Sequence, residues 1–293
     1  MYSGSIVAIV TPMTDSGEVD FDAWDRLLDW HVEQGTDGLV VCGTTGESPT
    51  VSLAEAVELT RRAVARIDGR MPIIAGSGSN DTALSIERTR ALATAGADAV
   101  LVVTPYYNKP TQDGLFQHFT AIADDSSVPV ILYNVPGRTG VDLLPETVER
   151  LAAHPRIVSL KEATGSLARL AELRARCGAD LEILSGDDPT AVDAMLAGAV
   201  GVISVTANVA PRLMHELCEA ALEGDEPAAR AIDARLAPLH RALFIESNPI
   251  PAKWAVQQLG LIGPGIRLPL TPLSASCHTP VRDAMRAAGV PCA

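Results

Sequence analysis

The sequence predicts an α/β fold, a (β/α)8 TIM barrel with an all-helical C-terminal extension, and three observations support this prediction. Short apolar, β-branched runs alternate with amphipathic stretches through residues 1–224. Eight such runs are present, which suits a closed barrel better than an open doubly wound sheet. After Ala221 the alternation stops and only helical patterns remain. We therefore expect the barrel over residues 1–224 and a helical domain over residues 225–293.

The eight predicted strands are runs rich in Val, Ile and Leu that are bounded by turn residues. They cover residues 5–11, 38–42, 72–76, 99–104, 129–133, 157–161, 181–185 and 201–205. Several are continuously apolar rather than alternating, which is typical of a parallel sheet buried on both faces. In the C-terminal extension, helical patterns cover residues 226–245, 249–259 and 278–288.

The helices between the strands carry recognisable start and stop signals. Ser52 and Glu55 have the spacing of a capping box, Asn80-Asp81 offers an N-cap, and Pro145-Glu146 suits a first helical turn. Three glycines lie where a helix should end and the chain turn back toward the sheet: Gly35, Gly96 and Gly178.

The composition argues against several classes of function. A net charge of −13 leaves no basic stripe for a nucleic-acid partner. The apolar run at residues 6–10 is too short for a signal peptide or a membrane span. We therefore expect a soluble, cytoplasmic protein. Five cysteines without a C-x-x-C pair predict free thiols in a reducing compartment: Cys42, Cys177, Cys218, Cys277 and Cys292.

Polar residues and glycines follow the predicted strands at their carboxyl ends, where the active sites of barrel enzymes lie. The loop after the second strand reads Gly43-Thr-Thr-Gly-Glu-Ser48, and the fifth strand ends at Tyr133, with Arg138 in the loop that follows. The loops at the opposite end are ordinary Ala, Gly and Asp turns. The sequence therefore places function on one rim of the barrel.

Lys161 ends the sixth predicted strand, in the run Ile157-Val-Ser-Leu-Lys161. The chain has only three lysines against twenty arginines, so a lysine in a buried strand is unusual for this protein. One interpretation is a side chain whose ammonium reaches solvent from the strand end. The other is a desolvated amine that attacks a carbonyl group and forms a Schiff base.

Other residues on this rim also allow two interpretations. Thr44 and Thr45 offer hydroxyls and backbone N–H groups that can hold a small carboxylate, although a capped turn gives the same pattern. Tyr133 and Tyr107 could transfer protons or simply pack. Arg138 could grip a carboxylate with two hydrogen bonds or be a surface arginine.

Three further patterns favour structural interpretations over metal or nucleotide sites. Asp187-Asp188-Pro189 could suggest a metal ligand set, but Asp before a helix with Pro in its first turn predicts an N-cap. His215-Glu216 lacks the second histidine of a zinc-protease motif, and Gly76-Ser-Gly78 lacks the third glycine of a dinucleotide site. The sequence predicts no metal site.

Three motifs together resemble the dihydrodipicolinate synthase family of pyruvate-dependent class I aldolases, which includes N-acetylneuraminate lyase. They are Gly43-Thr-Thr-Gly-Glu-Ser48, Tyr133-Asn-Val-Pro-Gly-Arg-Thr-Gly140 and Lys161-Glu-Ala-Thr-Gly165. The resemblance extends from residues 4–12 to Asn248-Pro-Ile-Pro-Ala-Lys-Trp254, nearly the full chain.

The resemblance implies a role for each residue on the rim. Lys161 would form the Schiff base, and a proton relay would consist of Thr44, Tyr133 and Tyr107, the last entering from a neighbouring subunit. The remaining roles would be substrate binding: Thr45 to the pyruvate carboxylate, Arg138 to the aldehyde substrate's carboxylate, and Gly186 and Ile203 as pocket-lining backbone groups. The resemblance also implies a homotetramer, built as a dimer of dimers, and no cofactor.

The implied reaction condenses pyruvate with L-aspartate-4-semialdehyde to give 4-hydroxy-tetrahydrodipicolinate, in lysine and diaminopimelate biosynthesis. Two alternatives stay open: a lyase of the same family for a keto-sugar acid, and a metabolite-sensing barrel without turnover. Arg138 favours the condensation of pyruvate with L-aspartate-4-semialdehyde over the sugar lyase. The complete set of relay residues favours the same condensation over the sensor. Three positions depart from lysine-inhibited relatives and predict weak or absent inhibition by L-lysine: Leu53, Ala56 and Leu84.

Overall fold

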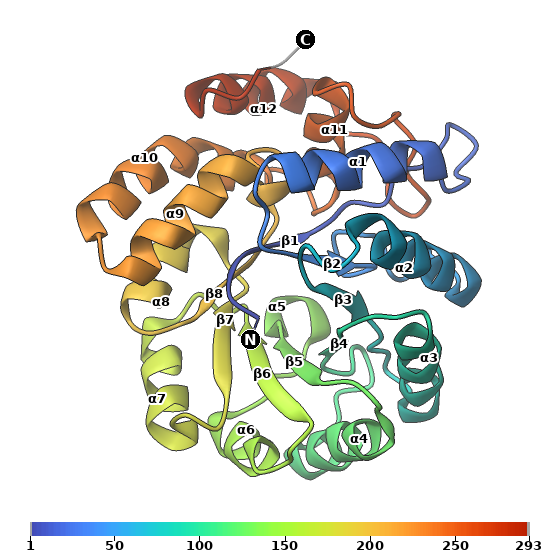
Figure 1. The fold of residues 1–293 in the computed structure, drawn as a ribbon, viewed down its shortest axis with the longest axis vertical. Coiled ribbons are helices and arrows are strands. Elements are labelled where there is room, and N and C mark those ends of the chain that lie inside the picture. Colours follow the sequence, from blue (N-terminus) through green and yellow to red (C-terminus); the bar gives the residue numbers. More distant parts are fainter. Residues whose placement is uncertain (1, 292–293) are drawn as a thin grey trace.

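The computed structural model describes residues 2–291, which form a closed barrel of parallel strands surrounded by helices (Figure 1). Each strand pairs with the next along the chain, and the last closes the barrel on the first. All eight predicted strands are confirmed; the largest difference is at β1, which ends at Ala8 rather than residue 11. The strands are β1 Gly4–Ala8, β2 Gly38–Val41, β3 Ile73–Gly76, β4 Ala99–Val103, β5 Val130–Asn134, β6 Ile157–Glu162, β7 Glu182–Ser185 and β8 Gly201–Ser204.

The helices that follow the strands begin and end where the local signals predict. Ser52 and Glu55 form the complete capping box of α2, and Asp81 caps α3 through its side chain. Gly35, Gly96 and Gly178 all have positive φ angles just beyond helix ends. The barrel helices are α1 Phe21–Glu33, α2 Leu53–Ile67, α3 Thr82–Thr94, α4 Gln112–Asp125, α5 Pro136–Thr139, α6 Pro145–Ala152, α7 Leu167–Cys177, α8 Ala191–Leu196 and α9 Pro211–Glu223.

Asp187 occupies the predicted N-cap position, with Pro189 in the first turn that follows, but its carboxylate does not cap a backbone N–H group. The turn η1 (Asp188–Thr190) has no side-chain cap, and the Asp187 carboxylate accepts a hydrogen bond from Thr190 Oγ1 at 2.7 Å. Asp188 Oδ2 accepts from the backbone N–H groups of Val205 and Thr206, at 2.9 and 3.0 Å. Strands β7 and β8 are neighbours, so the amides after β8 are close enough to compete for the carboxylate.

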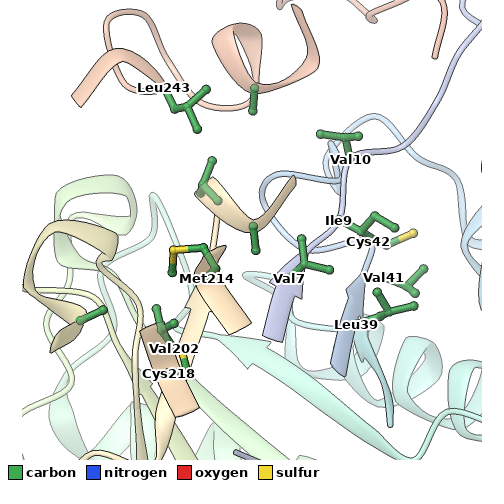
Figure 2. Packing of buried hydrophobic residues seen from close by; sticks show 14 of the residues in the cluster. Val7, Ile9, Val10, Leu39, Val41, Cys42, Val202, Met214, Cys218 and Leu243 are labelled. Carbon is green, nitrogen blue, oxygen red and sulfur yellow. The ribbon is translucent and has the colours of Figure 1, made fainter. Parts of the chain in front are cut away.

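Two separate apolar clusters lie on the two faces of the strands, as alternation of side chains requires. The outer cluster lies between strands and helices, and Figure 2 shows part of it around Val7, Val202, Met214 and Leu243. The inner cluster fills the barrel: Ile6, Ala8, Val40, Ile74, Ala99, Leu101, Ile131, Tyr133, Leu184 and Ile203. The interior of the barrel is therefore packed with side chains below the rim.

Three helices follow the barrel at the C-terminal end of the chain: α10 Glu226–Ala242, α11 Ile250–Gln258 and α12 Ala275–Ala287. They confirm the three helical patterns, and Figure 1 shows them gathered on one side of the barrel, beside α1 and α9. Leu236, Leu243 and Val281 belong to the same outer cluster as the barrel strands. The extension thus packs on the barrel through a continuous core, and a domain boundary at residue 224 stays a prediction.

Within residues 2–291, no helix combines the length and the apolar character needed to cross a bilayer. The described cysteines are free thiols: Cys42, Cys177, Cys218 and Cys277. Burial raises the pKa of Cys42 to about 12, so this thiol stays protonated. Cys292 lies outside the described residues.

Candidate active site

Lys161 and Tyr133 are paired residues of neighbouring strands and lie together at the carboxyl end of the barrel. They are register partners in the β5–β6 ladder, so both side chains point to the interior. Lys161 Nζ lies 4.4 Å from the centre of the Tyr133 ring. Only 6% of the Lys161 surface is exposed. The lysine is therefore buried in the rim and does not extend into solvent.

Glu162 follows Lys161 in sequence but does not neutralise it, because alternation places the two side chains on opposite faces of β6. The Glu162 carboxylate accepts hydrogen bonds from Asn134 Nδ2 at 3.0 Å and from the Thr164 N–H at 2.8 Å. Burial raises the pKa of Glu162, and these hydrogen bonds oppose the rise. Among residues 2–291, no carboxylate forms an ion pair with Lys161.

Gly186, directly after β7, leaves the space that Lys161 occupies. A Cβ atom at this position would lie 2.9 Å from Lys161 Cε and 2.6 Å from the Ala163 Cβ. The Gly186 N–H donates to the Glu162 carbonyl at 2.8 Å, which fixes its backbone against β6. A side chain at residue 186 would therefore displace the lysine.

The loop Gly43-Thr-Thr-Gly-Glu-Ser48 is held in an unusual conformation beside Lys161. Cys42 and Glu47, at its two ends, have φ angles of 53° and 59°, in the left-handed region that residues with a Cβ rarely adopt. Gly76 allows the close approach, since a Cβ there would lie 2.3 Å from the Cys42 carbonyl oxygen. Strained backbone of this kind is concentrated at functional sites.

Arg138 lies in the short helix α5, which begins directly after β5. Its side chain is exposed at the edge of the site, and Nη2 donates to the Asn248 carbonyl oxygen at 3.3 Å. Asn248 Nδ2 donates to Thr45 Oγ1 at 3.0 Å. One residue from beyond the barrel thus contacts both of the predicted carboxylate-binding side chains.

These side chains surround a cavity of about 120 Å³, which is large enough for a small keto acid. Six of the eight predicted site residues line it: Thr44, Thr45, Tyr133, Arg138, Lys161 and Gly186. Ile203 lies below, in the inner cluster, while Val205 lines the cavity two residues later. Tyr107 is 89% exposed and does not line the cavity of its own chain.

The lining residues that the sequence did not predict include Asp187, Phe244 and Asn248. Phe244 and Asn248 lie in the segment between α10 and α11, and this segment reaches the cavity. The motif that begins at Asn248 was a usable signal, since a polar residue before Pro-Ile-Pro has no obvious role within a helix. In residues 2–291, no cluster of three or more His, Cys, Asp or Glu side chains is arranged to hold a metal ion.

Comparison with protein families gives a match over residues 1–288 to the model of the dihydrodipicolinate synthetase family. The chain belongs to this family. A relative named 4-hydroxy-tetrahydrodipicolinate synthase, from Stutzerimonas stutzeri, is 58% identical over 290 residues, covering 99% of each chain. A relative of the same name from Pseudomonas aeruginosa is 57% identical, again over 99% of each chain.

Solved structures of the family have the same fold. The dihydrodipicolinate synthase of Acinetobacter baumannii, determined as a complex with pyruvate, superposes with a TM-score of 0.98 at 51% identity. The alignment covers 99% of this chain and all of that one. The enzyme from Aquifex aeolicus gives a TM-score of 0.97 at 44% identity, over 99% of both chains. Membership of the family is therefore established over residues 1–288, and the solved structures share the fold over 99% of the chain.

Proposed function

We propose that this protein is a lyase that condenses pyruvate with L-aspartate-4-semialdehyde to give 4-hydroxy-tetrahydrodipicolinate, in lysine and diaminopimelate biosynthesis. The observation that carries the proposal is the buried Lys161 amine, which has no carboxylate partner among residues 2–291 and faces a small cavity. The identity of 57–58% to relatives that bear the name of this activity supports the choice of substrates.

In the first half of the reaction, the Lys161 amine attacks the ketone carbon of pyruvate and water leaves, which gives an iminium. Thr45 holds the pyruvate carboxylate through its hydroxyl. The iminium withdraws electrons from the neighbouring methyl group, so that this group loses a proton and an enamine forms. The cavity has room for pyruvate but for little water, which favours the condensed form.

Protons are moved in each step by hydroxyl groups, namely Tyr133 with Thr44 and Tyr107. Tyr133 is in place in this chain, above the lysine. Tyr107 is exposed on the outside of the rim, which fits a tyrosine that completes the cavity of a neighbouring subunit. We propose a homotetramer, as a dimer of dimers, in which each site borrows this residue from its partner.

In the second half, the enamine carbon attacks the aldehyde of L-aspartate-4-semialdehyde, and the carbonyl oxygen takes up a proton. Arg138 binds the carboxylate of this substrate at the cavity edge. The substrate's own amine then attacks the iminium carbon and displaces Lys161, which closes the ring and restores the free lysine. Because Gly186 has no side chain, the space beside Lys161 stays free for the lysine during this exchange. The backbone of residue 186 and of residues 203 to 205 lines the substrate pocket.

A direct assay tests this proposal against the sugar-lyase alternative. Purified protein is given pyruvate with L-aspartate-4-semialdehyde, and separately N-acetylneuraminate, and the products are identified by mass spectrometry. The proposal expects the cyclic product from the first pair and no cleavage of the sugar acid. Cleavage of the sugar acid without ring formation would support the alternative, and no conversion in either assay would support the sensor.

Mixed subunits test the shared site. Neither Tyr107→Phe nor Lys161→Ala homo-oligomers should turn over efficiently, but their mixture should recover activity, because some sites then contain both residues. A mixture that exchanges subunits without recovery would contradict the role in a partner's site. Cytoplasmic location and weak inhibition by L-lysine stay predictions. Leu84 is 40% exposed, so an ammonium group that binds at this surface would meet an apolar side chain instead of a charged one.

A further inference from the structure

Asn248 lies in the segment between α10 and α11 and is 5% exposed, yet it belongs to no strand or loop of the barrel rim. Its side-chain nitrogen donates to Thr45 Oγ1 at 3.0 Å, and its backbone oxygen accepts from Arg138 Nη2 at 3.3 Å. The residue also lines the cavity. It thus contacts the groups that we assign to the carboxylates of both substrates.

The hydrogen bond to Thr45 decides which way the threonine hydroxyl points. A hydroxyl has one hydrogen to donate and can accept at its lone pairs. When Asn248 Nδ2 donates to Oγ1, the hydroxyl acts as the acceptor of that bond and its own hydrogen must be directed elsewhere. Among residues 2–291, Thr45 Oγ1 donates to no other group. The hydrogen is therefore available to an acceptor in the cavity, such as a carboxylate oxygen.

The position of Asn248 is itself fixed by the C-terminal extension. Lys253, one turn into α11, donates from its backbone to the Pro249 carbonyl at 2.8 Å and forms a buried ion pair with Glu47. Glu47 is in the same loop as Thr45. The Lys253–Glu47 ion pair therefore joins the C-terminal extension to the same loop that Asn248 contacts through Thr45. This second contact helps to hold the Asn248 amide in place.

The Asn248 side chain is not fully satisfied by these contacts. Its Oδ1 atom is buried and has no hydrogen-bond partner in the described part of the chain. Buried polar atoms without partners are uncommon in proteins. The nitrogen is therefore the atom through which the Asn248 amide forms its hydrogen bond, to Thr45 Oγ1.

We infer that Asn248 is a positioning residue: it orients the Thr45 hydroxyl as a hydrogen-bond donor to the pyruvate carboxylate, so that the C-terminal extension completes the first substrate's site. This inference rests on the proposed function and deepens it. Asn248 acts through Thr45 and does not itself touch the reacting atoms. It follows that its replacement weakens pyruvate binding before it affects the chemistry of Lys161.

The test is the pyruvate concentration at which half of the protein is trapped by borohydride as a reduced pyruvate adduct, a readout that needs no second substrate. Asn248→Ala should raise this concentration about tenfold, since a hydrogen bond to an anion loses its oriented donor. Asn248→Asp keeps the shape but turns the donor into an acceptor, and should raise it at least as much. Gln258→Ala, an amide of α11 that contacts Arg282 away from the cavity, is the matched control and should leave it unchanged.

A double-variant cycle separates orientation from a general structural role. Thr45→Val removes the hydroxyl, so adding Asn248→Ala to it should cause almost no further loss of pyruvate trapping. Independent, multiplying losses, or an unchanged half-trapping concentration in a folded Asn248→Asp protein, would overturn the inference. Failure of the parent protein to trap pyruvate at all would instead overturn the proposed function.

Discussion

Lys161 and Lys253 are buried to the same degree, 6% and 5% exposed, but only one of them has a carboxylate partner. Lys253 Nζ forms an ion pair with Glu47, whose other oxygen accepts from the Arg267 backbone N–H at 3.1 Å. Lys161 Nζ faces the Tyr133 ring and the cavity. The two lysines thus differ in their partners and not in their burial.

This difference shows that burial alone does not determine the role of a lysine side chain. Burial lowers the pKa of Lys253, but Glu47 opposes this and keeps the pair together, so the amine is held in one place as part of the structure. An amine without such a partner is free to bind or react with whatever enters the cavity. We therefore assign a structural role to Lys253 and a chemical role to Lys161.

Replacing Lys161 should have the largest effect on activity and almost none on stability. Lys161→Met removes the nucleophile, and turnover should fall by roughly three orders of magnitude or more. The free energy of unfolding should stay equal or rise, because a buried polar group without a hydrogen-bonding or charged partner is replaced by an apolar side chain. Steady-state rates and urea unfolding measure the two effects. If the Lys161→Met protein kept a tenth of the parent's turnover, the assignment of a chemical role to Lys161 would be contradicted.

Replacing Lys253 should produce the opposite pattern. Lys253→Met leaves the Glu47 carboxylate buried without its cation, and the free energy of unfolding should fall by about 3–5 kcal/mol. Adding Glu47→Gln should restore part of the loss, because the unpaired charge is then removed. Urea unfolding of the single and double variants measures this. If Lys253→Met were as harmless to stability as Lys161→Met, the ion pair would have no structural role.

The space around Lys161 can be tested without changing the lysine. Gly186→Ala places a methyl group within contact of Lys161 Cε and the Ala163 Cβ, and the displaced amine should form the adduct about a hundredfold more slowly. Gly137→Ala is a suitable control, since a Cβ there has no atom within 4 Å. The measurement is the rate of pyruvate trapping by borohydride. Equal rates for both variants would show that Lys161 does not need its present position.

Acid should weaken the region around Lys253 through a neighbouring pair. A hydrogen bond from Arg267 is the main cause that lowers the pKa of Glu55 from 4.5 to about 2. Since the folded pKa is the lower one, the stabilisation is complete above about pH 4.5 and is lost as the pH falls toward 2. Glu55→Gln should therefore lower stability at pH 7, by about 1–3 kcal/mol, and flatten its decline below pH 4.5. An unchanged acid profile by urea unfolding would contradict the pairing.

The sequence was sufficient for the barrel because strands and caps are local patterns. It was also sufficient to place residues at the carboxyl ends of strands, such as Lys161 and Tyr133, since the barrel brings these ends together at one rim. Asn248 could not be found this way. It meets Thr45 across 203 residues, and Lys253 meets Glu47 across 206, so only the fold of the C-terminal extension brings these groups together. The contacts of Asp188 could not be predicted for a related reason, because the amides of Val205 and Thr206 that donate to it directly follow the neighbouring strand β8.

The central claim is that Lys161, and neither of the other two lysines, is the reacting amine. Incubation with pyruvate and borohydride, followed by digestion and peptide mass spectrometry, tests it most directly. The account predicts one reduced pyruvate adduct per chain, on the peptide that contains Lys161, with Lys109 and Lys253 unmodified. An adduct on Lys253 or Lys109, or an active protein in which Lys161 is never modified, would contradict it.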